Sequence, residues 1–200
     1  MGDQESSTRQ SDDPGSPRIH YTQVFAQNAG KCVEEPCGGT KLHLGCGKAY
    51  WDGWLNVDLG EKADLRCDLS KLELPSNHAD VAVAIHVIEH FYAWDAPEVL
   101  AEWLRVLKPG GKLILELPCM DKVLAHIYAC VKKSVPISKT MGWFVFWGNP
   151  KHRDPLMVHK WGYSCESIVE TLQAVGFRDV AIEEPRYHFQ MRDMRVVGLK

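Results

Sequence analysis

The stretch HVIEHF, residues 86–91, holds two histidines and a glutamate at a spacing that could bind a metal. As H-x-x-E-H it matches a zinc hydrolase signature, in which two histidines hold the ion and the glutamate activates water. That chemistry requires His86 and His90 to lie one turn apart on a regular helix. The preceding residues 80–85, DVAVAI, instead form an apolar, β-branched run that is typical of a buried strand. We therefore expect a turn at the end of a strand, with the zinc hydrolase as a disfavoured alternative.

Glycines and aspartates follow the other predicted strands in the same way. The segment KLHLGCG, residues 41–47, predicts a strand broken by Gly45 and Gly47, and WLNVD ends on Asp58. A shorter segment, ADLRCD, ends on Asp68. Because ligands of open α/β sheets bind beyond the carboxyl ends of the strands, we expect these residues to converge with residues 86–90. A carboxylate such as Asp58 can accept two hydrogen bonds from a diol, so the pattern predicts a nucleoside-binding crevice.

The remaining elements alternate between helices and strands. A helix is predicted from Asp95, with Glu98 completing a capping box, to the stop at KPGG, and a strand follows over 112–118. A second helix ends at Gly176, and two more strands complete the chain. This alternation predicts a doubly wound, mostly parallel α/β sheet. We expect a disordered tail over 1–18 and a single domain over 19–200, with 119–162 as an insertion or lid on the acceptor side.

Composition narrows the class of partner. The chain is 45% hydrophobic and 24% charged, with a net charge of −3, which disfavours an electrostatic nucleic-acid binder. We identify neither a membrane-spanning run nor a secretory signal, and the seven cysteines form no disulfide framework. The sequence therefore predicts a cytoplasmic protein with a small-molecule substrate and no nucleic-acid or membrane partner, as a monomer or a homodimer.

Five of these motifs, taken in order, resemble those of the class I S-adenosylmethionine-dependent methyltransferases, in particular the type 11 methyltransferase-domain group. They are LHLGCG, NVDL, CDLSKLELP, DVAVAIHVIEHF and EWLRVLKPGGKLILELP. The segment HKWGYSCESIVETLQAVGF is similar to the family's closing segment, so the resemblance covers about residues 40–200. It implies a Rossmann-like, seven-stranded sheet of order 3-2-1-4-5-7-6 with the last strand antiparallel. The implied cofactor is S-adenosylmethionine, with S-adenosylhomocysteine as product and no metal.

The resemblance also implies roles for particular residues. The glycine turn would pass under the methionine part of the cofactor, Asp58 would bind the ribose, Asp68 would meet the adenine, and His86 would line the acceptor side. The complete implied set is Gly45, Cys46, Gly47, Asp58, Leu59, Asp68, Leu69, His86 and Val87.

Two features depart from the family. His43 stands two residues before the first glycine, where the family usually has an acid that contacts the cofactor's amino group. The first crossover, KAYWDGW, is short and places Tyr50, Trp51 and Trp54 where a regular helix is normal.

Catalysis and acceptor binding are assigned by position along the chain. Methyl transfer to oxygen or nitrogen requires removal of a proton, and His90 and His159 are the candidate bases. Glu89 could orient either histidine or face solvent. Four aromatic residues are candidates for holding the acceptor: Trp143, Trp147, Trp161 and Tyr163. The function we expect is methylation of a small molecule, with a hydroxyl of a saccharide or another biosynthetic intermediate as acceptor. A non-catalytic, cofactor-binding regulatory or partner protein is the alternative.

Overall fold

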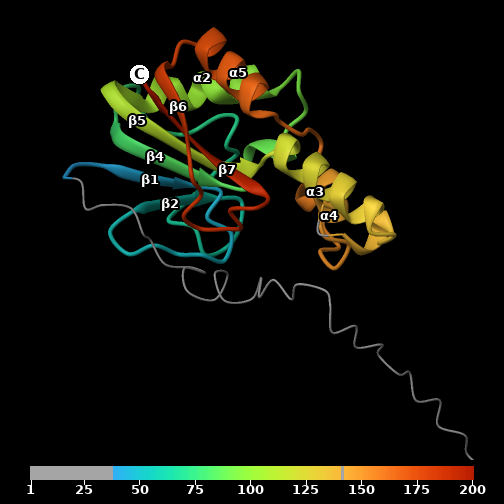
Figure 1. Ribbon diagram of the computed structural model, residues 1–200. Coiled ribbons are helices and arrows are strands. Elements are labelled where there is room, and N and C mark those ends of the chain that lie inside the picture. The colour runs from blue at the N-terminus through green and yellow to red at the C-terminus, as the bar shows by residue number, and fades with distance from the viewer. Residues whose placement is uncertain (1–37, 141) are drawn as a thin grey trace, which may run out of the picture.

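The computed structural model describes residues 38–140 and 142–200, and its centre is a seven-stranded sheet of order β3-β2-β1-β4-β5-β7-β6 (Figure 1). The predicted tail, 1–18, lies outside the described residues. The sheet order is the predicted one. The strands are β1 (Lys41–Leu44), β2 (Leu55–Asp58), β3 (Leu65–Arg66), β4 (Ala79–Ile85), β5 (Leu107–Pro118), β6 (Arg178–Glu183) and β7 (Asp193–Leu199).

The central strands are parallel and apolar. β1 pairs with β2 on one side and with β4 on the other, and β4 pairs with β5, all in parallel. β7 runs antiparallel to both β5 and β6, as the family resemblance implies. β5 begins at Leu107, earlier than the expected residue 112, because the KPGG turn is included in the strand. The parallel strands thus end at one edge of the sheet, where the predicted site residues follow them.

Helices α2 (Ala96–Val106) and α5 (Cys165–Val175) pack against each other beside the sheet (Figure 1). Fully buried residues of both helices, such as Leu100 and Leu172, belong to the same hydrophobic core as strand residues. α5 begins with a capping box from Ser164 and ends at Gly176 in the left-handed conformation, as predicted. The capping box predicted for α2 was wrong: Asp95 is the N-cap residue, but its own φ and ψ are helical and its side chain caps no N–H group.

Aromatic residues cover part of the sheet where the first crossover lacks a helix. Trp51 and Trp54 are buried with Tyr187 in a second, smaller hydrophobic cluster. The Trp51 ring stacks on His43 at a centroid distance of 3.7 Å and on Tyr187 at 5.3 Å. Asn56 fixes this turn, because its amide accepts from the Trp51 N–H and donates to the carbonyls of Trp51 and Trp54. The short crossover therefore replaces helix packing with aromatic stacking.

The insertion between β5 and α5 is helical in part. It contains α3 (Met120–Lys132), α4 (Trp143–Trp147) and two 3₁₀ turns, η2 (Ile137–Lys139) and η3 (Pro155–Met157). A third 3₁₀ turn, η1 (Ile88–His90), follows β4. α3 and α4 lie beside each other at one end of the sheet (Figure 1). Within the described ranges, no helix has the length and hydrophobicity needed to cross a membrane.

Candidate active site

The glycine turn after β1 lets the backbone come close to the end of β4 and leaves space for a ligand. Gly45 has φ of 68° and Gly47 has φ of 52°, both in the left-handed region that favours glycine. A Cβ at Gly45 would come within 2.5 Å of Val87 Cγ2, whereas one at Gly47 would meet no atom within 4 Å. Gly45 therefore packs the turn against the end of β4, and Gly47 leaves room for a ligand. Burial and nearby Asp58 raise the pKa of Cys46 to about 11, so Cys46 is a small, unreactive member of the turn.

Asp58 ends β2 and binds the same turn. Its Oδ2 accepts a hydrogen bond from the Gly47 N–H at 2.9 Å, and its Oδ1 accepts from the Gly60 N–H at 2.8 Å. Each carboxylate oxygen has two acceptor positions, so the carboxylate retains capacity for two hydroxyl donors. This arrangement fits the ribose role that the family resemblance implies for Asp58.

One carboxylate oxygen of Asp68 already accepts two hydrogen bonds, whereas each oxygen of Asp58 accepts one. Its Oδ1 accepts from both the N–H and the hydroxyl of Ser70, at 2.8 and 2.7 Å, in a local turn. Leu69 is anchored by its carbonyl, which accepts from Trp103 Nε1 at 2.9 Å, and its Cδ1 lies 3.5 Å from the position of a Cβ on Gly45. The glycine turn, Leu69 and Val87 thus meet at one place, while Leu59 is half exposed at the end of β2.

His43 packs in the aromatic cluster and does not take the cofactor-binding role of the family's acid. It is buried with Trp51, and its Nδ1 lies 3.2 Å from Asn56 Oδ1. Burial lowers the pKa of His43 to about 4, against the opposing effects of Asn56 and Asp58. The residue that replaces the family's acid is therefore a neutral packing residue of the aromatic cluster.

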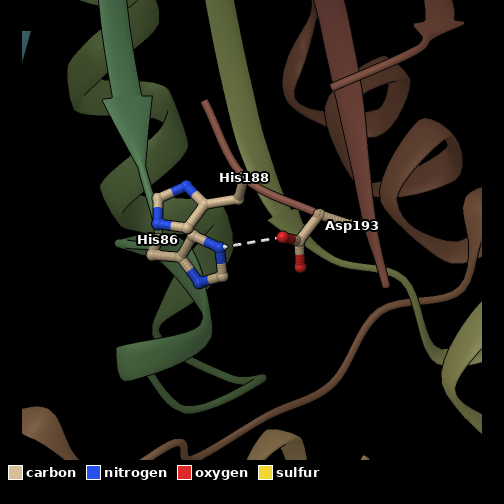
Figure 2. Close-up of side chains that lie close together, drawn as sticks. All are labelled: His86, His188 and Asp193. Carbon is tan, nitrogen blue, oxygen red and sulfur yellow. Dashed lines mark ion pairs between the residues drawn. The ribbon is translucent and has the colours of Figure 1, made fainter. Parts of the chain in front are cut away.

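His86 is held in an ionic network that the sequence did not reveal. Figure 2 shows His86, His188 and Asp193 close together at the ends of β4 and β7. His86 Nδ1 lies 2.8 Å from Glu89 Oε1, and its Nε2 lies 3.5 Å from Asp193 Oδ2. Burial lowers the pKa of His86, but the carboxylates of Asp193 and Glu89 outweigh that effect and raise it to about 9. Arg192 completes the network with a bidentate pair to Asp193, both contacts at 2.7 Å.

Glu89 is buried beyond the end of β4, on the side predicted to receive the acceptor. Only 2% of Glu89 is exposed, so of the two options left open by the sequence, solvent exposure is wrong. One ligand atom each of Glu89, His90 and His159 lie within 4.8 Å of one another. Lys160 and Trp161 donate their N–H groups to the Glu89 carbonyl, at 2.8 and 3.2 Å. His90 and His159, the two histidines predicted as catalytic, are 69 residues apart in the sequence. The insertion folds back and brings them together around the Glu89 carboxylate.

Backbone carbonyls orient both histidines. His90 Nδ1 lies 3.1 Å from the Val158 carbonyl, and His159 Nδ1 lies 2.7 Å from the Val145 carbonyl. A carbonyl can only accept, so each Nδ1 carries a proton, and in the neutral form of either ring Nε2 has the lone pair. Burial lowers the pKa of His159, which favours its neutral form, although Glu89 opposes the effect. The pair thus offers two basic nitrogens beyond the end of β4.

The four aromatic candidates separate into two groups. Tyr163 is buried, its hydroxyl has no hydrogen-bond partner among the described residues, and burial followed by the charge of Glu89 raises its pKa to about 12. Trp161 is half exposed and is tied to Glu89 by its backbone. Trp143 and Trp147 are exposed on α4. This helix contacts the histidine pair because the Val145 carbonyl lies 2.7 Å from His159 Nδ1. Tyr163 and Trp161 therefore lie next to the histidine pair, and the other two lie on the adjoining helix.

The geometry does not meet the requirement of the zinc hydrolase signature. His86 has φ of 52°, outside any helix, and only residues 88–90 form a 3₁₀ turn. His86 and His90 therefore do not share one face of a regular helix. His86 pairs with Asp193, and His90 pairs with His159.

Comparisons with known proteins agree with this arrangement. The family profile described as "Methyltransferase domain" matches residues 42–115. A probable S-adenosylmethionine-dependent methyltransferase of Mycolicibacterium smegmatis is 41% identical over 115 residues, which is 48% of this chain and 42% of that protein. The chain thus spans less than half the length of that relative.

Solved structures share the fold at low sequence identity. A methyltransferase from Archaeoglobus fulgidus has a TM-score of 0.55 at 18% identity and covers 82% of this chain and 87% of its own. One from Mesorhizobium loti has a TM-score of 0.54 at 17% identity, with coverages of 84% and 94%. With the sheet order, they show that the described residues have the fold of the class I S-adenosylmethionine-dependent methyltransferases. The profile and the Mycolicibacterium smegmatis relative match part of the chain, and that relative is described as dependent on S-adenosylmethionine.

Proposed function

We propose that this protein transfers a methyl group from S-adenosylmethionine to a hydroxyl of a small-molecule acceptor, such as a saccharide or another biosynthetic intermediate. The observation that carries the proposal is the junction at Val87. Its side chain packs on Gly45 in the predicted cofactor turn, and its carbonyl accepts from the His90 N–H at 3.0 Å. The two halves of the site, donor and acceptor, are thereby joined through one residue.

The residues present fit the cofactor. The open space above Gly47 would take its methionine part, the spare acceptor positions of Asp58 would take the ribose hydroxyls, and Leu69 would lie near the adenine. When bound, the cofactor supplies an electrophilic methyl group on a sulfonium. The chain's own contribution is alignment of the acceptor and disposal of its proton.

Acceptor activation falls to His90 and His159 in this proposal. In its neutral form each would have a free lone pair on Nε2, because Nδ1 donates to a carbonyl, and the buried Glu89 lies 2.8 Å from His86. The exposed rings of Trp161 and the α4 tryptophans offer apolar surface for stacking on a sugar or a ring. An acceptor hydroxyl can lose its proton directly to such a nitrogen.

The test is transfer of a radiolabelled methyl group from S-adenosylmethionine to a panel of saccharides and other hydroxyl-bearing acceptors. We expect His90→Gln and His159→Gln to lower kcat by about 10²-fold or more, as loss of a proton-transfer group does. Affinity for S-adenosylhomocysteine should stay unchanged. His152→Gln, at an exposed position of the insertion, is the matched control. Full turnover in both histidine variants would contradict the assigned roles.

A non-catalytic cofactor-binding protein is the second candidate, and one observation favours it. The family's acid before the first glycine is replaced by His43, which is buried in the aromatic cluster and offers no carboxylate to the cofactor. Tight binding of S-adenosylhomocysteine together with no turnover across the whole panel would support this candidate over the enzyme.

A further inference from the structure

We propose that Glu89, His90 and His159 form a binding site for one divalent transition-metal ion, such as Zn²⁺. The sequence-based expectation was that no metal binds, and the signature that suggested one used a different pair of histidines. The new set combines two imidazoles and one carboxylate, which is a ligand set that zinc and other first-row divalent ions accept. It shares His90 and His159 with the proposed methyl transfer and rests on the same site, but no predicted cofactor-binding residue takes part in it.

The geometry of the three ligands supports the site. One ligand atom of each residue lies within 4.8 Å of the other two. Ligands around zinc at about 2.0 Å from the ion lie roughly 3.3 Å apart, so small side-chain rotations would close the set. Glu89 and His90 are adjacent on η1, and His159 reaches them from the insertion.

The outer contacts are those that metal-binding histidines make. A ligating histidine almost always donates its second ring N–H to a carbonyl or carboxylate, which fixes the tautomer and aims the free nitrogen. His90 and His159 both do so, to the carbonyls of Val158 and Val145. The insertion that supplies His159 therefore also supplies both orienting carbonyls.

Glu89 provides the independent indication of a ligand. Only 2% of it is exposed, and neither carboxylate oxygen has a well-directed hydrogen bond among the described residues, although His86 Nδ1 lies 2.8 Å from Oε1 as an ion pair. The buried hydroxyl of Tyr163 also has no hydrogen-bond partner within the described part of the chain. Buried oxygens of this kind are rarely left without a partner, and a cation beside Glu89 would satisfy the carboxylate.

Two other clusters with ligand-type side chains fit a cation less well. In the cluster of Figure 2, His86, His188 and Asp193, the Arg192 guanidinium already makes two 2.7 Å contacts to Asp193 and lies 3.1 Å from His86 Nε2. A positive charge thus already occupies that carboxylate. In the third cluster, Asp121 accepts from the Cys165 N–H at 2.9 Å. Burial raises the pKa of the Cys165 thiol, which lies 3.5 Å from Cys119 Sγ, to about 12, so the thiolate that a metal needs is disfavoured. At the Glu89 site the neighbouring cation is His86, which makes one 2.8 Å contact to Oε1 and leaves Oε2 without a partner among the described residues.

The experiment is titration of the chelator-treated, cofactor-free full chain with ZnCl₂ by calorimetry, and with Co²⁺, whose visible absorption reports its coordination geometry. We expect one equivalent of each ion to bind. Glu89→Gln, His90→Gln and His159→Gln should each weaken binding by at least about 100-fold, beyond the 10–100-fold that loss of an outer-shell partner costs. His188→Gln, which changes the cluster of Figure 2 and none of the three proposed ligands, should leave the affinity unchanged.

Thermal unfolding of the metal-free variants separates ligand loss from misfolding, and only variants that unfold like the native chain are compared. Absence of stoichiometric binding to the native chain would overturn the site. Equal binding by Glu89→Gln and His159→Gln, or loss of binding in His188→Gln, would overturn it as well. S-adenosylhomocysteine binding measured in the presence of the chelator tests the methyltransferase proposal separately.

Discussion

The close packing of Gly45 on Val87 joins the glycine turn to the end of β4. Replacement by alanine would force a Cβ to within 2.5 Å of Val87 Cγ2, in a backbone conformation with φ of 68°. We expect Gly45→Ala to lower the free energy of unfolding by about 1–2 kcal/mol for the left-handed backbone, and by a further 1–3 kcal/mol, roughly, for the clash. Chemical denaturation measures the difference.

Gly47→Ala is the matched comparison for that prediction. Its φ is 52°, so it carries a similar backbone cost, but its Cβ would meet no atom within 4 Å. It should therefore destabilise the protein less than Gly45→Ala. Equal destabilisation by the two substitutions would show that the contact with Val87 has no energetic importance.

His43 predicts a pH dependence of stability. Its pKa is about 4 in the folded protein against an ordinary value of 6.5, so between these values the unfolded chain binds a proton that the folded chain does not. Stability from this residue is complete above about pH 6.5 and is lost as the pH falls toward 4. The difference of 2.5 units corresponds to roughly 3 kcal/mol.

Denaturation of the native chain and His43→Gln between pH 4 and 7 measures this effect. The native protein should lose more stability on acidification than the variant, by up to about 3 kcal/mol, because glutamine does not titrate. Parallel curves for the two proteins would contradict a buried, neutral His43.

At the scale of elements, Glu116 of β5 holds the connection between β6 and β7. Its buried carboxylate accepts hydrogen bonds from the N–H groups of Arg186, Tyr187 and His188, at 2.7 to 2.9 Å. This connection carries Arg192 and Asp193 to His86. We expect Glu116→Gln to reduce the free energy of unfolding by about 2–3 kcal/mol, because an amide NH₂ cannot accept from these donors.

Glu184→Gln on the same connection is the control for that prediction, since its exposed carboxylate makes only a 3.7 Å ion pair with Lys122. A change in stability below about 1 kcal/mol is expected there. If denaturation curves of Glu116→Gln and Glu184→Gln coincided, the buried carboxylate would not anchor the connection.

The sequence predicted elements better than it predicted contacts between them. Apolar runs such as residues 80–85 and the stops at Gly45 and Gly176 are local signals, and the structure has the strands, turn and helix end expected there. The partners of His86 could not be found in this way, because Asp193 lies 107 residues away and approaches only when β7 pairs with β5. A charged Arg192-Asp193 pair at the start of an apolar strand was the one local sign of that network.

Glu89 illustrates the same limit at the site itself. The segment HVIEHF contains two histidines and a glutamate, and the zinc signature pairs His90 with His86 because of their helical spacing. The fold pairs it with His159 instead, from the far end of the insertion. Whether Glu89 was exposed or buried depended on that long-range packing, which no spacing rule within six residues describes.

In the whole molecule, the two halves of the candidate site meet at the end of β4. Residues on one side, from Gly45 to Leu69, form the predicted cofactor half, and η1 with the insertion forms the proposed acceptor half. A net charge of −3 and an exposed aromatic surface on α4 accord with a small, weakly charged acceptor. Both proposals, methyl transfer and metal binding, depend on this junction and share His90 and His159, whereas only methyl transfer uses the predicted cofactor residues.

The central claim is cofactor binding at the glycine turn, and calorimetric titration with S-adenosylhomocysteine tests it most directly. We predict that the native chain binds and that Asp58→Asn weakens binding by about 10–100-fold, since it removes charge-assisted acceptance of the ribose hydroxyls. Asp52→Asn, at an exposed position of the first crossover, should bind like the native chain. Equal affinity of the native chain and Asp58→Asn, or no binding by the native chain, would contradict the account.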